Sequence, residues 1–458
     1  MPFIRSISGL RATLGDSLLP NVISNYVAAF ETLLPKGEVI VGMDGRPSGN
    51  WIKKIVNGTL LACSRQVRFI GIVPTPTVQI SIEQRKAAGG ISITASHNSE
   101  EWNGLKFINN EGVFLDMLEN TQLWKAEKYG AFNFSKQLIF PEVIFDNYAI
   151  KNHIQSVINT PLFTADAVKK IKERKFKVVV DAVNASGSKA IPMLLKKLGC
   201  EVFELYCNET GNFPHTPEPL SINLTALAEE VKKTGADLGI AVDPDADRLA
   251  LINENGEPIG EERTITLATE TVLSNINKFK FITKVPVVVV NQSTTRTVDD
   301  ICEKYGAKLE RSAVGEINVV KAMKKFNAVI GGEGSGGVIL PSCHYGRDSL
   351  VGTALILFHL AVNKFSLSEA NNNLPMYNMI KKRCVFHGDL SKFYNAVIEQ
   401  FPNGKPVKGD GIKILFPESW VQARASNTEP IVRIIAEDQN PKEAKNLVKT
   451  MMKICEKM

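Results

Sequence analysis

The stretch AGGISITASHNSEEWNG, Ala88 to Gly104, joins a short apolar run to a polar turn. The run Gly90 to Thr94 is typical of a buried strand in an α/β sheet, where strands are short, apolar and rich in β-branched residues. The turn places Ser96 directly before His97 and Asn98. We expect it to display the Ser96 hydroxyl in a cleft, as a nucleophile or phosphate carrier. The alternative is an ordinary polar turn, in which Ser96 and Asn98 make local hydrogen bonds.

Apolar runs of the same kind recur along the chain and alternate with amphipathic stretches. The runs are Glu38–Gly42, Val67–Gly71, Lys177–Asp181, Leu238–Val242 and Val285–Val290. The amphipathic stretches, for which helices are predicted, include Asn50–Ser64, Ala190–Leu198 and Thr225–Lys233. A chain of 458 residues is too long for one hydrophobic core. The alternation therefore predicts several layered α/β domains with buried parallel strands.

The order of these elements divides the chain into four segments. Residues 1–148, 149–252 and 253–368 each repeat the α/β alternation, although no sequence identity between them is visible. Residues 369–458 offer a shorter α+β unit, with a strand predicted at Ile431–Ile435. The stretch Ser366–Leu374, with three consecutive asparagines, is predicted to be a linker before this unit.

Composition narrows the classes of function. The net charge of +6 is spread over the length without a dense basic block, and 7% of residues are aromatic. These values give no indication of nucleic-acid binding. They are compatible with a basic cleft that binds a small anionic molecule. The longest apolar run, Ala354–Val362, is too short to span a membrane, and the first residues lack the apolar core of a signal peptide.

The seven cysteines are scattered, odd in number and without a CxxC pair. This pattern predicts reduced thiols in a cytoplasmic protein, with neither a disulfide framework nor a zinc site.

Three aspartates, Asp243, Asp245 and Asp247, directly follow the apolar run that ends at Val242. In an extended backbone, this alternate spacing sends all three carboxylates to one side. They would repel one another, and a hard divalent cation such as Mg²⁺ removes the conflict. One alternative is a calcium EF-hand loop, although Arg248 stands where that loop needs glycine and the flanks resemble strands. The other is a solvated acidic turn without metal.

A glycine-rich segment, Gly332–Gly337, follows the apolar run Ala328–Ile330. The negative charge of Glu333 argues against contact with a phosphate, and a carboxylate suits hydrogen bonds to sugar hydroxyls.

Another polar loop, Arg424–Pro430, brings a guanidinium, two hydroxyls and an amide into five residues through Arg424, Ser426, Asn427 and Thr428. Several converging donors suit a phosphate monoester, and Arg433 would add a second charge. A polar hairpin with an Asx-turn is the alternative, but it gives no reason for the arginine.

In this order, the Ser96 turn, the aspartates, the glycine-rich segment and the Arg424 loop resemble the α-D-phosphohexomutases, the family of phosphoglucomutase, phosphomannomutase and phosphoglucosamine mutase. The resemblance implies three similar α/β mixed-sheet domains followed by a smaller α+β C-terminal domain around a central cleft. It also implies interconversion of a hexose 6-phosphate and a hexose 1-phosphate through a phosphoserine and a hexose 1,6-bisphosphate. The expected partner is a phosphosugar, with no nucleic acid or membrane, and the chain is expected to be a monomer or homodimer.

The resemblance also assigns roles to single residues. Ser96 would be the phosphoserine and a Mg²⁺ ligand beside the three aspartates, with Arg11, Lys106 and Arg248 nearby. Glu333 and Ser335 would bind sugar hydroxyls, and the phosphate would be bound by Arg424, Ser426, Asn427, Thr428 and Arg433. His97 and Lys106 are the candidates for proton transfer, and either Arg11 or Lys106 could instead be an ordinary exposed cation.

The chain departs from the family at Gly337, where many members have a histidine with an active-site role. His344 is a candidate substitute, and a structural histidine is the alternative. The segment Arg311–Glu316 also resembles a ligand-facing loop of the family.

The glycine-rich segment Gly332–Gly337, called the sugar loop below, resembles that of the phosphoglucosamine mutase-like branch, which implies conversion of glucosamine 6-phosphate to glucosamine 1-phosphate. A C2 ammonium would be attracted to Glu333 or Glu316. The second hypothesis for the function is phosphoglucomutase/phosphomannomutase activity. The third is that the chain is an inactive relative that binds sugar phosphates. A serine hydrolase using Ser96 and His97 is disfavoured because adjacent residues on a turn rarely face each other and no Gly-x-Ser-x-Gly elbow is present.

Overall fold

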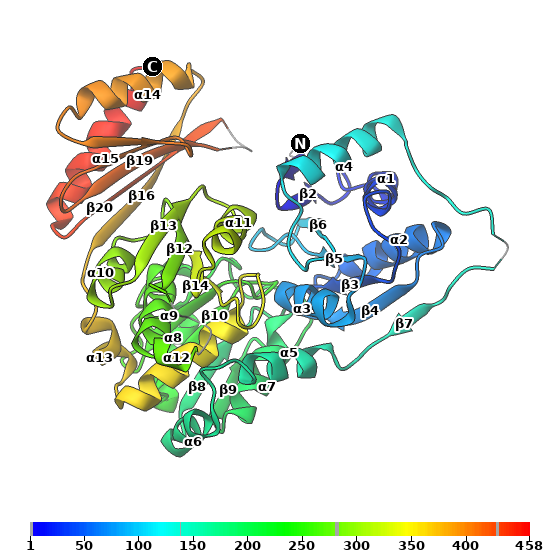
Figure 1. Cartoon of the computed structure of the whole chain (residues 1–458), viewed down its shortest axis with the longest axis horizontal. Coiled ribbons are helices and arrows are strands. Elements are labelled where there is room, and N and C mark those ends of the chain that lie inside the picture. Colours follow the sequence, from blue (N-terminus) through cyan, green and yellow to red (C-terminus); the bar gives the residue numbers. More distant parts are fainter. Residues whose placement is uncertain (1–2, 138, 280–283, 427–429) are drawn as a thin grey trace.

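The computed structural model describes residues 3–137, 139–279, 284–426 and 430–458, which form four sheets with helices packed against them (Figure 1). The first three sheets mix parallel and antiparallel pairs, and the fourth, in the orange and red part of the chain, is antiparallel. The predicted fold class, three similar α/β domains and a smaller α+β domain, is confirmed. The boundaries at 148, 252 and 368 stay predictions.

The first sheet has seven strands in the order β1-β2-β6-β5-β3-β4-β7. Its strands are β1 (Phe3–Ser6), β2 (Gly9–Thr13), β3 (Val39–Met43), β4 (Val67–Ile72), β5 (Gly89–Ile93), β6 (Trp102–Ile108) and β7 (Val143–Phe145). Its helices are α1 (Pro20–Glu31), α2 (Gly49–Ala62), α3 (Thr75–Arg85) and α4 (Met117–Tyr129). Helices α1, α2 and α4 pack on one face, and α3 packs on the other. Because both faces are covered, β3 and β5 are buried along their whole length.

The second and third sheets have four strands each. The second has the order β11-β10-β8-β9, with β8 (Lys177–Asp181), β9 (Glu201–Leu205), β10 (Leu238–Val242) and β11 (Leu249–Asn253). The third has the order β13-β12-β14-β15, with β12 (Val287–Asn291), β13 (Lys308–Ser312), β14 (Ile330–Glu333) and β15 (Gly337–Ile339). Their helices are α5 (Ala149–Ile158), α6 (Ala165–Arg174), α7 (Gly187–Lys197), α8 (Thr225–Thr234), α9 (Glu262–Ser274), α10 (Thr297–Lys304), α11 (Glu316–Phe326) and α12 (Ser349–Asn363), with short 3₁₀ turns η1 (Ser221–Asn223) and η2 (Ile276–Lys278).

One four-strand unit occurs in all three of these sheets. The orders β6-β5-β3-β4, β11-β10-β8-β9 and β15-β14-β12-β13 are the same when strands are counted within each unit. In each unit three strands are parallel, and the fourth returns antiparallel to the third. The turns between the third and fourth strands, at 94–101, 243–248 and 334–336, are therefore equivalent, and they carry the three motifs singled out in the sequence.

Helix α12 contains the longest apolar run of the sequence, and it is buried almost all round. It packs against α5, α6, α7 and α9, and so joins the second unit to the third in one continuous core. Its apolar character is explained by this burial. Within the described ranges, no helix is both long and apolar enough to cross a membrane.

The fourth sheet has the order β16-β20-β19-β18-β17, and α14 and α15 cover one of its faces (Figure 1). Its elements are β16 (Asn378–Val385), α14 (Leu390–Gln400), β17 (Lys405–Lys408), β18 (Ile412–Leu415), β19 (Trp420–Ala425), β20 (Ile431–Asp438) and α15 (Pro441–Glu456). The predicted linker before it is wrong in part, because α13 (Leu367–Asn372) forms there. Ser366 and Glu369 make a capping box that starts this helix.

Two cysteines correct the prediction of reduced thiols throughout. Cys384 on β16 and Cys455 on α15 form a disulfide within the core of the fourth domain. The two residues are 71 positions apart, so no local spacing could have indicated the pair. The other five cysteines are free.

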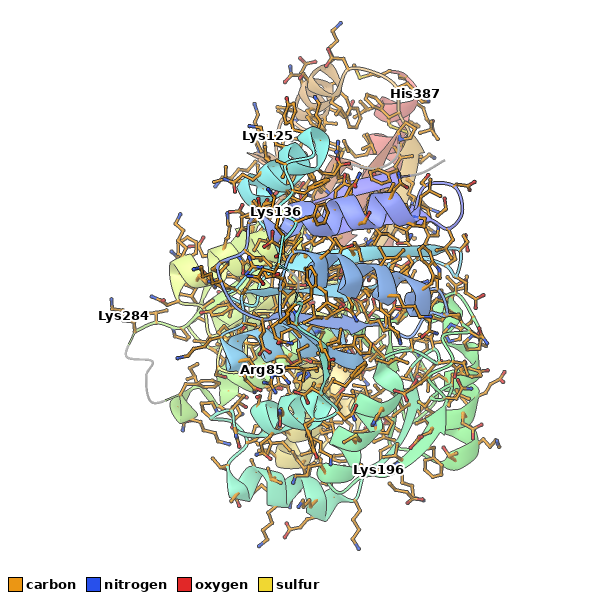
Figure 2. The ribbon with its side chains drawn as sticks, turned by 90° about the vertical axis from the view of Figure 1, so that its right-hand side faces the viewer. Arg85, Lys125, Lys136, Lys196, Lys284 and His387 are labelled. Carbon is orange, nitrogen blue, oxygen red and sulfur yellow. A yellow bond between two sulfur atoms is a disulfide. The ribbon has the colours of Figure 1, made fainter. Side chains whose placement is uncertain are left out.

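The basic side chains labelled in Figure 2 lie at separate places over the surface. They are Arg85, Lys125, Lys136, Lys196, Lys284 and His387.

Candidate active site

Ser96 lies in the first turn after β5, in a left-handed backbone conformation with φ of 51°. Such a conformation is costly for a residue with a side chain, and it is typical of functional turns. The backbone N–H of Ser96 donates to Thr94 Oγ1 at 2.8 Å, and Thr94 Oγ1 donates to Asp44 Oδ2 at 2.6 Å. Ser96 Oγ donates to Asp243 Oδ2 at 3.0 Å. Ser96 is only 1% exposed and is surrounded by its neighbours, and the expected display of its hydroxyl in a cleft stays a prediction.

His97 lies closer to this hydroxyl than the sequence indicated. Its Nδ1 is 3.4 Å from Ser96 Oγ, so the geometric objection to a serine–histidine pair is wrong. The nearer partner of Ser96 Oγ is nevertheless the Asp243 carboxylate. A hydroxyl that shares its site with three carboxylates fits phosphoryl transfer at a metal better than hydrolysis by a triad.

The three aspartates follow β10 and are buried together. Asp243, Asp245 and Asp247 are at most 1% exposed, and each offers a carboxylate oxygen within 4.8 Å of the others. The flanking elements are the antiparallel strands β10 and β11, which rules out the EF-hand. The burial rules out a solvated acidic turn.

Lys106 on β6 enters this acidic cluster. Its Nζ donates to Asp245 Oδ2 at 2.5 Å and to Asp247 Oδ2 at 2.9 Å, and the residue is 1% exposed. The reading of Lys106 as an ordinary exposed cation is therefore wrong. Burial lowers its pKa, but the two carboxylates outweigh burial and raise it, so the ammonium stays charged.

The remaining carboxylate oxygens fit a metal ion. Asp245 Oδ1 and Asp247 Oδ1 are buried and have no hydrogen-bond partner among the described residues. Burial raises the pKa of Asp243 far above its usual range, and the charges of Asp247 and Asp245 raise it further. A cation with oxygen ligands would satisfy the two orphaned oxygens and relieve this repulsion. The donor set therefore fits Mg²⁺.

Two arginines, Arg11 and Arg248, lie close enough to His97 for their charges to act on it. Arg11 Nη1 donates to Asn98 Oδ1 at 3.1 Å, and Arg248 Nη1 donates to Glu218 Oε1 at 3.1 Å. Burial lowers the pKa of His97 well below its usual range, and the charges of Arg248 and Arg11 lower it further. The imidazole is therefore neutral at physiological pH.

Glu333 ends β14 and is held firmly in place. Its Oε1 accepts from Asn291 Nδ2 at 2.8 Å and from the Gly315 N–H at 3.0 Å, and its Oε2 accepts from Arg347 Nη1 at 2.6 Å. Burial raises the pKa of this carboxyl, but Arg347 and the other donors outweigh burial and lower it. Ser335 lies two residues further on, in the turn before β15.

Arg347 is the main residue that sequence reasoning missed. Nothing in the local sequence around position 347 indicated a role for it. Its guanidinium binds Asp247, Glu316 and Glu333 at 2.8, 3.0 and 2.6 Å. A single cation thus joins the aspartate turn to the sugar loop.

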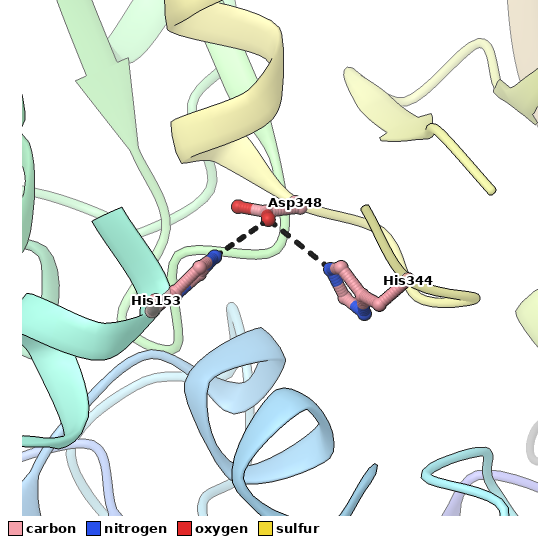
Figure 3. Close-up of side chains that lie close together, drawn as sticks. All are labelled: His153, His344 and Asp348. Atoms are coloured by element: carbon pink, nitrogen blue, oxygen red, sulfur yellow. Dashed lines mark hydrogen bonds and ion pairs between the residues drawn. The ribbon is translucent and has the colours of Figure 1, made fainter. Parts of the chain in front are cut away.

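His344 points away from this centre. Its Nε2 and that of His153 both lie against Asp348 Oδ2, at 3.1 and 2.7 Å (Figure 3). His153 Nδ1 is 2.8 Å from Thr77 Oγ1, which links the network to α3. Both histidines are therefore structural in this arrangement, and the proposed substitution of His344 for the family histidine is not supported.

This network leads to a prediction about stability. Burial raises the pKa of Asp348, but His153 and His344 outweigh burial and hold it well below its usual range. A depressed folded pKa contributes stability above the unfolded value of about 3.9, and this is lost as the pH falls through the folded value. Asp348→Asn should therefore lower the thermal midpoint at pH 7, by the equivalent of about 3 kcal/mol, with the deficit shrinking below about pH 4.

Asp389→Asn is the matched control, because Asp389 also caps a helix but is exposed. Asparagine keeps the cap in both variants, so the difference between them reports the buried charge. Equal midpoints for the two variants at pH 7 would show that the histidine pair adds nothing.

The Arg424 loop joins β19 to β20 in the fourth domain. Arg424 faces Arg433 across the strand pair, and Arg433 in turn faces Arg383 on β16. The three guanidinium groups therefore share one face of the sheet, opposite the face that α14 and α15 cover. Like charges in directly opposite positions destabilise a sheet. Asp410 Oδ2 lies 3.8 Å from Arg424 Nε, and an anionic ligand would add further compensation. Arg383 was not identified from the sequence, because it lies 41 residues before Arg424.

Of the other predicted phosphate ligands, Ser426 donates its backbone N–H to the carbonyl of Ile431 at 2.9 Å. Asn427 and Thr428 lie outside the described residues. The same face of the sheet rests on the third domain, where Thr295 Oγ1 donates to Glu437 Oε1 at 2.5 Å and Ser293 Oγ donates to Gln422 Oε1 at 2.8 Å.

Comparison with known families agrees with this arrangement. Models of the phosphoglucomutase/phosphomannomutase family match the chain at α/β/α domain I over residues 4–128, domain II over 151–256, domain III over 262–377 and the C-terminal domain over 389–454. The chain belongs to this family. It is therefore an α-D-phosphohexomutase, as the sequence motifs predicted.

Relatives of this phosphohexomutase carry two kinds of name. A phosphoglucomutase/phosphomannomutase of Thermococcus kodakarensis is 34% identical over 457 residues, covering 98% of this chain and 97% of the relative. A phosphoglucosamine/phosphogalactosamine mutase of Sulfurisphaera tokodaii is 30% identical over 457 residues, covering 98% of both chains. A solved phosphoglucomutase/phosphomannomutase family protein from Burkholderia thailandensis has the same fold, with a TM-score of 0.84 at 24% identity, covering 99% of this chain and 98% of the other.

Proposed function

We propose that this phosphohexomutase interconverts glucosamine 6-phosphate and glucosamine 1-phosphate, with Ser96 as the phosphoryl carrier. The contact of Ser96 Oγ with Asp243 Oδ2, at the edge of an acidic cluster with two orphaned oxygens, carries the proposal. Asp243, Asp245 and Asp247 would hold Mg²⁺ together with the phosphoserine. Bound there, the ion would stabilise charge on the phosphoryl oxygens during transfer.

The reaction takes place in two transfers. In the first, a sugar hydroxyl bonds to phosphorus and loses its proton, the bond between Ser96 Oγ and phosphorus breaks, and the leaving Ser96 Oγ takes up one proton to become a hydroxyl again. The product is a hexose 1,6-bisphosphate. This intermediate turns around and returns its other phosphate to Ser96 Oγ, which regenerates the phosphoserine.

The chain's own residues divide this work. The row Arg424, Arg433 and Arg383 would bind the phosphate that is not being transferred, in either orientation of the sugar. Lys106 keeps Asp245 and Asp247 in place, and His97 offers a ring nitrogen 3.4 Å from Ser96 Oγ. The neutral His97 imidazole is the candidate to accept the hydroxyl proton, and the charged Lys106 ammonium is the candidate to donate one.

The choice of an amino sugar is supported by the sugar loop and by the relative from Sulfurisphaera tokodaii. The predicted attraction of Glu333 or Glu316 for a C2 ammonium is weakened, because both carboxylates already bind Arg347. The relative from Thermococcus kodakarensis favours a second candidate function, which is the interconversion of glucose or mannose phosphates.

Kinetics with the three substrates distinguish these functions. We expect kcat/KM for glucosamine 6-phosphate to exceed that for glucose 6-phosphate and mannose 6-phosphate by roughly tenfold, since discrimination by one substituent is of this order. The measurement compares the three sugars under identical Mg²⁺ and bisphosphate concentrations. A higher value for glucose or mannose would establish the second candidate and leave the phosphoserine mechanism untouched.

A further inference from the structure

Gly337, at the start of β15, lies where the fold leaves no room for a side chain. Its backbone φ lies outside the left-handed region that favours glycine. A Cβ added there would lie 2.3 Å from Arg347 Cδ and 2.9 Å from Arg347 Cγ, which is far inside van der Waals contact. The volume that a side chain at 337 would take is therefore filled by the stem of Arg347.

The head of Arg347 is held by three carboxylates from three different places. Nη2 donates to Asp247 Oδ2 in the aspartate turn, Nε to Glu316 Oε2 at the start of α11, and Nη1 to Glu333 Oε2 at the end of β14. An arginine guanidinium carries its charge throughout the pH range in which proteins are folded. A planar group with donors in several directions can bind all three at once, and a lysine ammonium cannot do so in the same geometry.

The backbone beside Arg347 is held in place by hydrogen bonds of the next residue, Asp348. The Asp348 N–H donates to the carbonyl of Val338 at 2.8 Å, and Asp348 Oδ1 accepts from the Leu350 N–H to cap α12. The other carboxylate oxygen of Asp348 lies between His153 and His344 (Figure 3). The position of the guanidinium is thus set by the rigid frame of the domain as well as by its partners.

We propose that Arg347 is a positioning residue for phosphoryl transfer, which fixes the aspartate turn relative to the sugar loop, and that Gly337 is required to admit it. The inference rests on the proposed function. Asp247 belongs to the centre that carries the phosphoryl group, and Glu333 belongs to the loop that would read the sugar. Arg347 contacts Asp247 and Glu333, so it connects the donor side to the acceptor side. Loss of the Arg347 guanidinium would misplace the aspartate turn relative to the sugar loop. The arginine row on the fourth domain would still bind phosphate.

The test uses two substitutions in the full-length protein. Arg347→Lys keeps the charge but loses the planar fork, and Gly337→Ala keeps the arginine but drives a methyl group into its stem. We expect each variant to lower kcat about 100-fold, because a misplacement of about 1 Å has an effect of this size. The affinity for the sugar phosphate, measured by calorimetry, should stay within about threefold, as should KM.

Gly58→Ala is the matched control, since a Cβ at Gly58 in α2 meets open space. It should keep wild-type kcat and KM. Wild-type kcat in a folded Arg347→Lys or Gly337→Ala variant would overturn the inference. So would a loss that appears only in KM and affinity, or a loss of the folded state in both variants, which would make Arg347 a binding or a purely structural group. Absence of turnover in the wild type and in Gly58→Ala would instead overturn the proposed function, and this inference with it.

Discussion

Ser96→Ala is expected to abolish mutase turnover, with a fall in kcat of about 10⁴-fold or more, because no other group can take its place as nucleophile. The phosphoenzyme should disappear as well. Incubation with a hexose 1,6-bisphosphate followed by intact-mass measurement should show one added phosphate on the wild type and none on the variant. The fold should survive, since alanine removes one hydroxyl from an enclosed site and leaves the backbone as it is.

Ser99→Ala is the control for this experiment. Ser99 lies in the same turn, is exposed, and donates only to Glu101 Oε1 at 2.7 Å among the described residues. It should keep both turnover and phosphorylation. Wild-type turnover in Ser96→Ala with bisphosphate present would show that the phosphoryl group is carried elsewhere.

Asp243→Asn should have opposite effects on activity and on the stability of the metal-free protein. Turnover should fall about 10³-fold, because the site loses a charged metal ligand and the oxygen that contacts Ser96. The metal-free variant should unfold at a temperature no lower than that of the metal-free wild type, since one of three mutually repelling buried carboxylates is gone. Mg²⁺ should raise the midpoint of the wild type, by the equivalent of about 2.7 kcal/mol at 100 times its dissociation constant, and should leave the variant nearly unchanged.

Asp166→Asn makes the same chemical change at an exposed position on α6, where the carboxylate forms an ordinary surface pair with Lys170. It should respond to Mg²⁺ as the wild type does. The metal assignment would be wrong if chelation left wild-type turnover intact, or if Asp243→Asn kept the full Mg²⁺ shift.

Local pattern was sufficient for most of the fold. Strands such as Lys177–Asp181 and Leu238–Val242 were predicted with their observed bounds, because short β-branched runs that are buried on both faces leave a clear signal. The helix at 367–372 was predicted as a linker, although Ser366 and Glu369 form a capping box that the sequence contains. Attention to that spacing would have found it.

The sequence by itself determined the motifs whose chemistry lies within a few residues: Ser96 in its turn, the alternate aspartates from Asp243 to Asp247, and Arg424 in its loop. Each can be recognised because its atoms are neighbours along the chain. The tertiary structure alone decided that Lys106 neutralises two of those aspartates, that Arg347 fills the space left by Gly337, and that Arg383 joins Arg424 and Arg433. A buried charge must find its partner in space, and the partner comes from whichever element packs there. The partners of Lys106, Asp245 and Asp247, lie 139 and 141 positions away along the chain, and no local pattern carries such a link.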